Sequence, residues 1–524
     1  MRSDGTMVTV REATLALLRA HRMTTIFGNP GSTELPMFRD FPDDFSYVLG
    51  LQESVVLAMA DGYAQATRNA AFVNLHSSAG VGHALGSLFT AHKNQTPLVV
   101  TAGQQARSIL PYDPFLFAER ATEFPRPFVK WACEPARAED VPAAIARAYH
   151  VAMEAPCGPT FVSVPVDDWD RMCASIAPRA IASRNPGDPA ALREAAETLA
   201  AARRPAIVVG AGVARDDAWH EVVALAERHA AQVWVSPMSA RCGFPEDHPL
   251  FAGFLTAARE PIVASLDGHD VILVLGGPMS LYHVEGFGPH VPEGARIVQI
   301  ADNHGMLAWN PASTGIVADT KLAVATLLDA TAPPVRPTPA MPARKPDLDG
   351  RVFDDRYLLQ QIARLRPADA IIVEEAPSSR GPMHDYLPIT RENGFYTCAS
   401  GGLGHGLPAA IGVALGRPGE KVIAFLGDGS SMYAIQGLWT AAQLRLPVSF
   451  VIANNHRYEA LHHFGRHFGL QDMVGTNLPA IDFCALAQGQ GIPATKVAAA
   501  GDLDAALTAS FTATGPTLIE VVID

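Results

Sequence analysis

The chain has 524 residues, of which 48% are hydrophobic and 18% are charged, and its formal net charge is −13. A chain of this length exceeds what one hydrophobic core supports, and domains of about 100–200 residues would divide it into three. The negative charge offers no field that attracts nucleic acid or anionic lipid, and lysine and arginine form no basic cluster. These properties argue against a nucleic-acid partner and predict a soluble protein.

The start of the chain and the cysteines predict a cytoplasmic location. Residues 10–18 are interrupted by Arg11 and Glu12, so they predict an amphipathic helix and not a signal peptide. The six cysteines lie far apart and form no CxxC pair, which predicts reduced thiols. The longest apolar runs, such as 271–275, are too short to span a membrane, so no membrane partner is expected.

Two proline-rich stretches, 178–189 and 333–346, predict linkers. They divide the chain into predicted domains 1–180, 181–340 and 341–524. In each part short apolar runs alternate with helical stretches rich in alanine and leucine, which is typical of parallel sheets covered on both faces. The predicted fold class is therefore α/β, with three doubly wound parallel-sheet domains. The predicted strands are 98–101, 161–164, 206–210, 271–275, 297–300, 422–426, 448–453 and 518–522.

A weak internal repeat links the first and third parts of the chain. Residues 79–85 resemble 401–407, the apolar run after Pro97 resembles the run after Pro447, and 158–162 resemble 515–519. The three pairs occur in the same order along the chain. This favours two related domains on either side of an inserted middle domain.

The most specific motif is a Gly-Asp-Gly-Ser segment at 427–430, with 24 residues between Gly429 and the pair Asn454-Asn455. Asp428 follows one predicted strand and Asn455 follows the next, so both side chains should reach the same sheet edge. Their oxygens are the hard ligands that Mg²⁺ shares with phosphate and water. The backbone N–H groups of Gly429 and Ser430, at the start of a predicted helix, favour a diphosphate.

This motif resembles the signature of the thiamine diphosphate (ThDP)-dependent enzymes of the pyruvate decarboxylase and acetolactate synthase group, which is GDG-x(24–27)-NN. The resemblance implies ThDP and Mg²⁺ as cofactors, with Ca²⁺ or Mn²⁺ as possible substitutes for Mg²⁺. It also implies a third metal ligand, the main-chain carbonyl of Arg457, and a division into pyrimidine-binding, middle and pyrophosphate-binding domains.

The resemblance further implies the residues that contact the thiamine part of the cofactor. Glu53, eight residues before the Asp-Gly-Tyr-Ala segment at 61–64, matches the carboxylate that hydrogen-bonds the aminopyrimidine N1′. Leu403 matches the residue that holds the cofactor bent, and the Gly401 carbonyl matches the acceptor of the 4′-amino group. The remaining expected cofactor-binding residues are Ser378, Tyr433 and Tyr458.

In this family the aminopyrimidine carboxylate and the diphosphate motif come from different subunits. The resemblance therefore implies a homo-oligomer, at least a dimer, with a tetramer as the expected form.

Ser32, His76 and His283 match the serine and two histidines of the benzoylformate decarboxylases within this family. A histidine that titrates near neutrality can protonate the alkoxide formed from a keto carbon. The resemblance implies that His76 acts at that step, that His283 relays a proton before aldehyde release, and that Ser32 holds the substrate carboxylate. The expected activity is non-oxidative decarboxylation of an aromatic 2-keto acid, benzoylformate or an analogue, to an aldehyde and CO₂.

The substrate pocket is expected to include Ser32, His76, Leu110, Thr397 and Phe464. Thr397 stands where the benzoylformate decarboxylases carry an aromatic residue, so the aryl clamp should be looser. The substrate can therefore be a substituted, larger or aliphatic 2-keto acid.

Other interpretations of the function stay open. The chain could be a ThDP-dependent carboligase, a 2-hydroxyacyl-CoA lyase or an acetolactate synthase-like enzyme, or it could bind ThDP without turnover. The pair His462-His463 is interpreted as structural or pocket-lining. The Gly-Ala-Gly segment at 210–212 lacks the third glycine of a dinucleotide-binding fingerprint, which argues against FAD or NAD.

Overall fold

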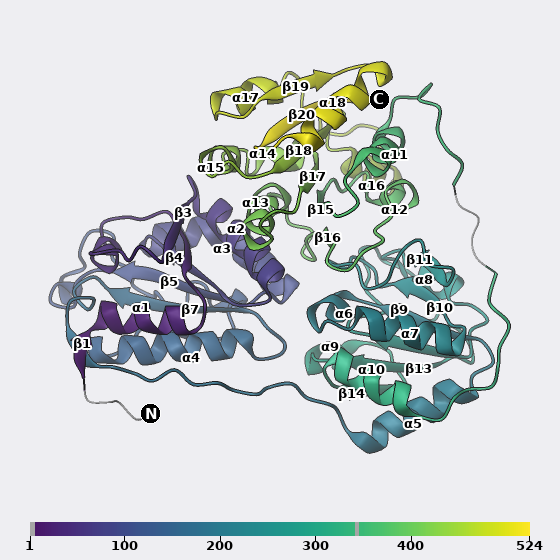
Figure 1. Cartoon of the computed structure of the whole chain (residues 1–524), viewed down its shortest axis with the longest axis horizontal. Coiled ribbons are helices and arrows are strands. Elements are labelled where there is room, and N and C mark those ends of the chain that lie inside the picture. The colour runs from purple at the N-terminus through teal and green to yellow at the C-terminus, as the bar shows by residue number, and fades with distance from the viewer. Residues whose placement is uncertain (1–5, 341–344, 524) are drawn as a thin grey trace. The chain divides into compact units, whose positions relative to one another are not determined.

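A computed structural model describes residues 6–340 and 345–523 and contains three predominantly parallel sheets with flanking helices (Figure 1). The predicted α/β fold class is confirmed. The chain divides into two compact units. Unit 1 comprises Met1–Ala182, Asp349–Arg380 and Ser400–Asp524, and unit 2 comprises Ser183–Leu348 and Gly381–Ala399.

The first sheet of unit 1, here called the N-terminal sheet, has the strand order β3-β2-β4-β5-β7-β6. Its central strands are buried along their whole length, as their continuous apolar sequence predicts. All its pairings are parallel, so the strands end at one common edge. Its strands are β2 (Thr25–Gly28), β3 (Ser46–Leu49), β4 (Ala71–Leu75), β5 (Leu98–Gln104), β6 (Ala132–Cys133) and β7 (Pro159–Pro165).

Helices follow these strands, and α1 begins with a complete capping box. The Thr9 side chain accepts from the Glu12 N–H, and the Glu12 carboxylate accepts from the Thr9 N–H. The helices of this part are α1 (Val10–Ala20), α2 (Glu53–Thr67), α3 (Ser77–Asn94) and α4 (Val141–Met153). Short 3-10 helices cover Leu35–Phe38, Leu110–Tyr112, Arg126–Phe128 and Ala138–Asp140, and β1 (Met7–Thr9) pairs antiparallel with β8 (Met172–Ala174).

Within unit 1, the strands of the second sheet, here called the C-terminal sheet, have the order β15-β17-β18-β20-β19, with parallel pairings. This order corresponds strand for strand to β2-β4-β5-β7-β6 of the N-terminal sheet. The strands are β15 (Ile371–Glu375), β17 (Val422–Gly427), β18 (Val448–Asn454), β19 (Ala494–Val497) and β20 (Thr517–Val522). The helices are α11 (Asp355–Leu365), α13 (Gly406–Gly416), α14 (Asp428–Met432), α15 (Gly437–Gln443), α16 (Glu459–His467), α17 (Phe483–Gly489) and α18 (Ala500–Thr512).

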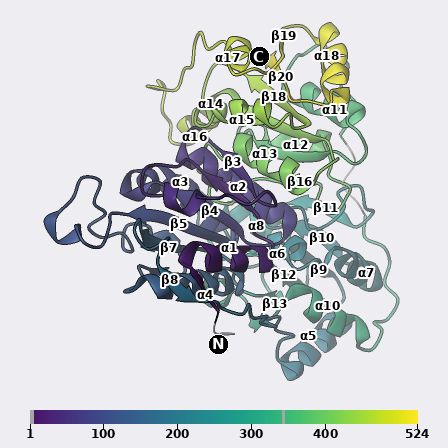
Figure 2. The ribbon, with the colours of Figure 1, turned by 60° about the vertical axis from the view of Figure 1, so that its left-hand side comes forward.

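The two halves of unit 1 meet where α2 packs against α13, and both views show these helices side by side (Figures 1 and 2). Glycines allow the backbones to approach closely. A Cβ added at Gly412 would lie 1.9 Å from the Met59 carbonyl oxygen, and one at Gly62 would lie 2.3 Å from the Ala409 carbonyl oxygen. Any larger side chain at either position would push the two helices apart.

Unit 2 contains the middle sheet, with the order β11-β10-β9-β12-β13-β14 and parallel pairings. Its strands are β9 (Pro205–Val209), β10 (Gln232–Val235), β11 (Phe251–Phe254), β12 (Val271–Leu275), β13 (Arg296–Ala301) and β14 (Thr314–Val317). Its helices are α5 (Pro189–Ala201), α6 (Ala211–Arg215), α7 (Trp219–His229), α8 (Arg259–Ser265), α9 (His304–Trp309) and α10 (Thr320–Asp329). The boundary between the units falls at the start of α12 (Arg380–Tyr386), and β16 (Phe395–Tyr396) belongs to unit 2.

The glycines of the 210–212 segment serve backbone packing. A Cβ at Gly210 would lie 2.4 Å from the Gly277 Cα, and one at Gly212 would lie 2.6 Å from the Gly276 Cα. The order of the middle sheet is the one common in dinucleotide-binding folds. However, the space beside Gly210 and Gly212 is occupied by Gly276 and Gly277, which follow the neighbouring strand β12.

The eight strands predicted from the sequence are all strands of the structure, and 271–275 has the predicted bounds. The predicted helix 10–18 is α1 and ends two residues later. Residues 175–188 are irregular, as the first predicted linker requires, whereas part of the second, 341–344, lies outside the described residues. No helix in the described part of the chain is long and apolar enough to cross a membrane.

Candidate active site

Three predicted residues follow strand ends at one edge of the N-terminal sheet. Ser32 lies in the loop after β2 and is exposed, Glu53 begins α2 after β3, and His76 follows β4 directly. Because β2, β3 and β4 are parallel neighbours, their carboxyl ends bring these loops together.

Glu53 is a buried carboxylate with two polar side-chain partners. Asn29 Nδ2 donates to Oε1 at 3.2 Å, and His83 Nδ1 lies 3.0 Å from Oε2. The Glu53 side chain is only 10% exposed, whereas that of His83 is 64% exposed. The carboxylate is therefore held in place at the start of α2 by a loop amide and by a histidine of α3.

His76 is oriented by a buried carboxylate that belongs to the same loop as Ser32. Its Nδ1 lies 2.9 Å from Glu34 Oε2 and 3.2 Å from Thr33 Oγ1. Glu34 also accepts the backbone N–H groups of Gly31 at 2.8 Å and Gly103 at 2.9 Å. This arrangement fixes the imidazole and leaves Nε2 as the nitrogen for a substrate.

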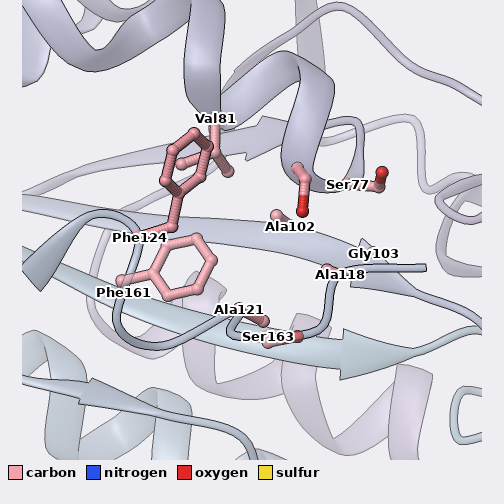
Figure 3. Close-up of a pocket in the computed structure, with 10 residues that line it drawn as sticks. Ser77, Val81, Ala102, Gly103, Ala118, Ala121, Phe124, Phe161 and Ser163 are labelled. Atoms are coloured by element: carbon pink, nitrogen blue, oxygen red, sulfur yellow. The ribbon is translucent and has the colours of Figure 1, made fainter. Parts of the chain in front are cut away.

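The turn after His76 has an unusual backbone and opens on a small pocket. Ser77 has φ +47°, a conformation that a non-glycine residue adopts at some energetic cost. In Figure 3 the rings of Phe124 and Phe161 line one side of the pocket and Ser77 lies on the other. A mainly apolar hollow thus lies beside the residue that follows His76.

At the edge of the C-terminal sheet, Asp428 and Asn455 converge. The Arg457 N–H lies 3.1 Å from Asp428 Oδ2 and 3.2 Å from Asn455 Oδ1, so both oxygens face the same amide. Asp428 follows β17 and Asn455 follows β18, and the two strands pair in parallel with Gly427 opposite Ala453. The structure therefore brings together the two side chains predicted as metal ligands.

The surroundings of Asp428 fit a divalent cation and a diphosphate. Burial raises the pKa of Asp428, although backbone N–H groups of Gly429, Arg457 and His456 counteract the shift. A cation bound to this hard oxygen donor would offset the cost of burying its negative charge. The Tyr458 ring packs on Gly429, where a Cβ would lie 2.2 Å from Tyr458 Cε1.

The turn at 401–404 is anchored at both ends. Gly401 has φ +71°, which favours glycine, and Leu403 is partly buried. Thr90 and Ser400 hydroxyls lie 2.8 Å apart before the turn. After it, Glu375 accepts the backbone N–H groups of His405 and Gly406, each at 3.0 Å.

Glu375, which the sequence analysis does not single out, ties this turn to the diphosphate motif. Its carbonyl accepts the Ser430 hydroxyl at 2.6 Å. Burial raises the pKa of Glu375 to about 7, against the opposing effects of His405 and of the two N–H groups.

The other predicted residues are distributed over both units. Ser378 and Tyr433 lie in unit 1, in the turn after β15 and after α14. Leu110 and Phe464 are partly buried there, whereas His283 and Thr397 belong to unit 2. Thr397 is buried, and its N–H donates to the Ala240 carbonyl at 3.0 Å.

The histidine pair of α16 makes separate contacts. His462 Nε2 lies 3.1 Å from Thr476 Oγ1, and His463 Nε2 lies 3.1 Å from Glu459 Oε1. The two rings thus have different partners.

Asn29, Glu34 and His83 are likewise not among the residues predicted from the sequence. Asn29 and Glu34 lie in the loop that contains Ser32, and His83 lies in the 79–85 segment of the internal repeat. These three residues could have been identified because each is a polar residue close in sequence to a predicted site residue.

Comparison with known proteins gives matches along the whole chain. Residues 8–119, 192–327 and 378–521 match the N-terminal TPP binding, central and C-terminal TPP binding domains of thiamine pyrophosphate enzymes. The chain is 41% identical to benzoylformate decarboxylase of Pseudomonas aeruginosa over 98% of this chain and 99% of that protein.

Two solved structures are similar in both sequence and fold. One is benzoylformate decarboxylase from Polynucleobacter necessarius, with a TM-score of 0.96, 38% identity and 98% coverage of each chain. The other is the ThDP-dependent 4-hydroxybenzoylformate decarboxylase of Rhodococcus jostii RHA1, with a TM-score of 0.95, 40% identity and 99% coverage of each chain. With the three domain matches, these similarities show that the chain belongs to the family of thiamine pyrophosphate enzymes.

Proposed function

We propose that this protein decarboxylates benzoylformate, or an aromatic 2-keto acid closely related to it, to the aldehyde and CO₂, using ThDP and Mg²⁺. The observation that carries the proposal is the convergence of Asp428 and Asn455 on the Arg457 amide at neighbouring strand ends. The relatives named benzoylformate and 4-hydroxybenzoylformate decarboxylase, similar over almost the whole chain, support the reaction and the substrate class.

The proposed metal ligands are Asp428, Asn455 and the Arg457 carbonyl, with Ca²⁺ or Mn²⁺ able to replace Mg²⁺. The backbone at Gly429 and Ser430 would bind the diphosphate together with Ser378, Tyr433 and Tyr458, while Glu53, Gly401 and Leu403 would hold the thiamine part. When bound, ThDP supplies a nucleophilic carbon and accepts the electron pair released as CO₂ leaves.

Side chains of the protein would transfer protons and orient the substrate. His76, held through Nδ1 by Glu34, would use Nε2 to protonate the keto oxygen of the substrate as it gains negative charge. Ser32 would hold the carboxylate without adding charge, so that loss of neutral CO₂ stays favourable. His283 would return a proton before the aldehyde leaves.

The proposed enzyme is a homo-oligomer, at least a dimer and in its expected form a tetramer, in which Glu53 serves the cofactor of a neighbouring subunit. The substrate pocket would be formed by Ser32, His76, Leu110, Thr397 and Phe464. Because Thr397 offers no aromatic ring, we expect substituted benzoylformates to be accepted alongside benzoylformate.

The test is a keto-acid panel with added ThDP and Mg²⁺, in which CO₂ and aldehyde are both measured. We expect equal amounts of CO₂ and aldehyde from benzoylformate and its ring-substituted analogues. Cleavage of a 2-hydroxyacyl-CoA in the absence of CO₂ release from any keto acid would contradict the proposal and favour a lyase.

A further inference from the structure

Glu375 is a buried carboxylate that caps a helix 30 residues further along the chain. It ends β15, and its side chain accepts the backbone N–H groups of His405 and Gly406, each at 3.0 Å, at the start of α13. His405 is the N-cap residue of that helix, and its own side chain makes no capping hydrogen bond. The start of α13, and the 401–404 turn before it, are therefore positioned by the end of a strand and not by a local cap.

The main chain of the same residue holds the diphosphate segment 427–430. The Glu375 carbonyl accepts the Ser430 hydroxyl at 2.6 Å. Glu375 also lies opposite Leu426 in the pairing of β15 with β17, the strand that leads into this segment. A side chain and a carbonyl of one residue thus hold two segments that are more than 20 residues apart in the sequence.

The turn also lies directly against its neighbours. A Cβ added at Gly406 would lie 2.5 Å from Glu375 Cβ, and one at Gly404 would lie 2.8 Å from Tyr433 Cβ. Tyr433 follows α14, the helix that begins with the diphosphate segment. The turn therefore packs both on the end of β15 and on the residue that follows α14.

The charged side chains around Glu375 have strong partners of their own. His405 Nε2 lies 2.8 Å from Asp61 Oδ2, and Glu374 is paired with Arg380 at 2.9 Å. The two N–H groups at the start of α13 are the donors that hold the Glu375 carboxylate, and a charged acceptor makes such bonds stronger than a neutral one. A neutral side chain in its place would hold the turn less firmly.

The geometry points to Glu375 as a positioning residue: it fixes the 401–404 turn relative to the diphosphate segment and thereby holds bound ThDP in its bent form. This inference rests on the proposed function, in which the diphosphate binds at 427–430 and Leu403 lies against the thiamine part. In the bent form the 4′-nitrogen of the cofactor lies beside the C2 hydrogen that it must remove. A displacement of about 1 Å between the turn and the segment would slow that step about 10²-fold.

A carboxylate that only caps α13 predicts a different outcome. Its loss would lower the free energy of unfolding and leave the bound cofactor as reactive as before. Loss of a positioning residue instead lowers the reactivity of a cofactor that still binds, because Asp428 and Asn455 remain in place. The two roles can therefore be separated by measuring stability, affinity and cofactor reactivity on the same variants.

The experiment uses the full-length protein with Glu375→Ala, which removes both hydrogen bonds, and Glu375→Gln, whose amide oxygen can keep one of them. Asp482→Ala is the matched control, because Asp482 caps α17 in the same unit by accepting the Ala485 N–H at 2.9 Å and has no proposed role.

Four quantities are measured on each protein. Without ThDP and Mg²⁺, denaturant unfolding gives the stability, and hydrogen–deuterium exchange of the backbone amides at 400–407 reports how firmly the turn is held. Calorimetry with Mg²⁺ gives the ThDP affinity. At saturating ThDP and Mg²⁺, without substrate, acid quench and NMR give the rate at which the C2 hydrogen exchanges with deuterium.

We expect Glu375→Ala to exchange the C2 hydrogen about 10²-fold more slowly than the wild type, with a much smaller loss of ThDP affinity. The amides at 400–407 should exchange faster than in the wild type. Glu375→Gln should lie between Glu375→Ala and the wild type in both measurements. Asp482→Ala should lose stability but exchange the C2 hydrogen at the wild-type rate. If Glu375→Ala does not fold, the C2 exchange rate of Glu375→Gln decides the question.

Wild-type C2 exchange in Glu375→Ala would overturn the inference, as would wild-type amide exchange at 400–407. An equal slowing of C2 exchange in Asp482→Ala would also overturn it, because the effect would then follow from lower stability. Failure of the proposed function looks different: the wild type would bind ThDP and exchange its C2 hydrogen but release no CO₂ from any keto acid.

Discussion

The side chain of Glu34 connects the loop after β2 with the end of β5 and with His76. It accepts from backbone N–H groups on either side of β4 and holds the imidazole through Nδ1. With Nδ1 engaged, Nε2 is the nitrogen available to a substrate. Glu34 thus orients His76 for proton transfer by holding one of its two ring nitrogens.

Replacing His76 by Ala is expected to lower turnover by about 10²–10⁴-fold while ThDP binding stays unchanged, as for other general acid–base groups. Glu34→Gln should also lower turnover, because the amide cannot accept from all the donors that face Glu34. Steady-state kinetics with a ThDP titration checks both variants. Unchanged turnover in His76→Ala would remove this residue from the mechanism.

Glu134→Gln serves as a control for Glu34→Gln. Glu134 directly follows β6 of the same sheet, accepts the Ser163 hydroxyl at 2.7 Å and has no proposed role in the chemistry. We expect it to keep wild-type turnover. Equal losses in the two variants would mean that Glu34 acts through general stability and not through His76.

Some residues of the candidate site could be predicted from the sequence, whereas others are evident only in the structure. Asp428, Asn455 and Glu53 could be predicted because each belongs to a motif with fixed spacing next to a strand end. Glu34 and His83 could not, because their contacts depend on how the loop after β2 folds and on the register of α3 against α2. Neither property leaves a periodic pattern in the sequence.

At the scale of elements, a buried ion pair joins α2 to the start of α13. His405 Nε2 lies 2.8 Å from Asp61 Oδ2, and Asn94 donates to the same carboxylate oxygen at 2.8 Å. Burial alone would lower the pKa of His405, but the hydrogen bond and charge of Asp61 outweigh it and raise that pKa. Burial would raise the pKa of Asp61, but the charge and hydrogen bond of His405, together with hydrogen bonds from Thr96 and Gln65, lower it.

Asp61→Asn is expected to destabilise the protein by about 3–5 kcal/mol, because it leaves a buried charge without its partner. Denaturant unfolding measures this loss. Lys421→Met is a suitable comparison, because Lys421 is a buried ionisable residue that precedes β17, at the end of the strand opposite Asp428. A loss below about 1 kcal/mol for Asp61→Asn would show that the pair does not hold the helices together.

The same pair predicts a direction for the pH dependence of stability. The contribution of His405 is fully present below its unfolded pKa of about 6.5 and is lost as the pH rises through its higher folded pKa. That of Asp61 is present above about pH 3.9 and is lost as the pH falls through its lower folded pKa. The free energy of unfolding, measured from pH 6 to 9, should therefore decrease less with rising pH in Asp61→Asn than in the wild type.

Two of the three sequence echoes that predicted an internal repeat lie at equivalent places in the two sheets of unit 1, at the starts of β5 and β18 and of β7 and β20. The first does not, because residues 79–85 lie in α3, after β4, whereas residues 401–407 lead into α13, before β17, the counterpart of β4. The strand order of the middle sheet was not predictable, because the sequences of its short strands carry no information on which strands are neighbours. The bounds of the three predicted domains stay predictions.

For the whole molecule, the central question is which chain supplies Glu53 to a given cofactor. If Glu53 serves a neighbouring subunit, two inactive variants can complement each other. Mixing Glu53→Gln and Asp428→Asn chains would then create heterodimers with one intact site and one site that lacks both residues.

We expect co-expression of the two variants to give about one quarter of the wild-type activity, because half of the randomly assorted dimers carry one intact site. Each variant alone should be inactive. Turnover of purified mixed dimers measures the effect. Activity no higher than that of the parent variants would mean that one chain supplies both residues to the same site.

The measurement that tests the central claim most directly is a calorimetric titration of ThDP into the metal-free protein, with and without Mg²⁺. The account predicts tight binding only when Mg²⁺ is present. It also predicts that Asn455→Ala loses about 10²-fold in affinity or more, whereas Lys421→Met binds like the wild type. Equal ThDP affinity in EDTA and in Mg²⁺, or wild-type affinity in Asn455→Ala, would contradict it.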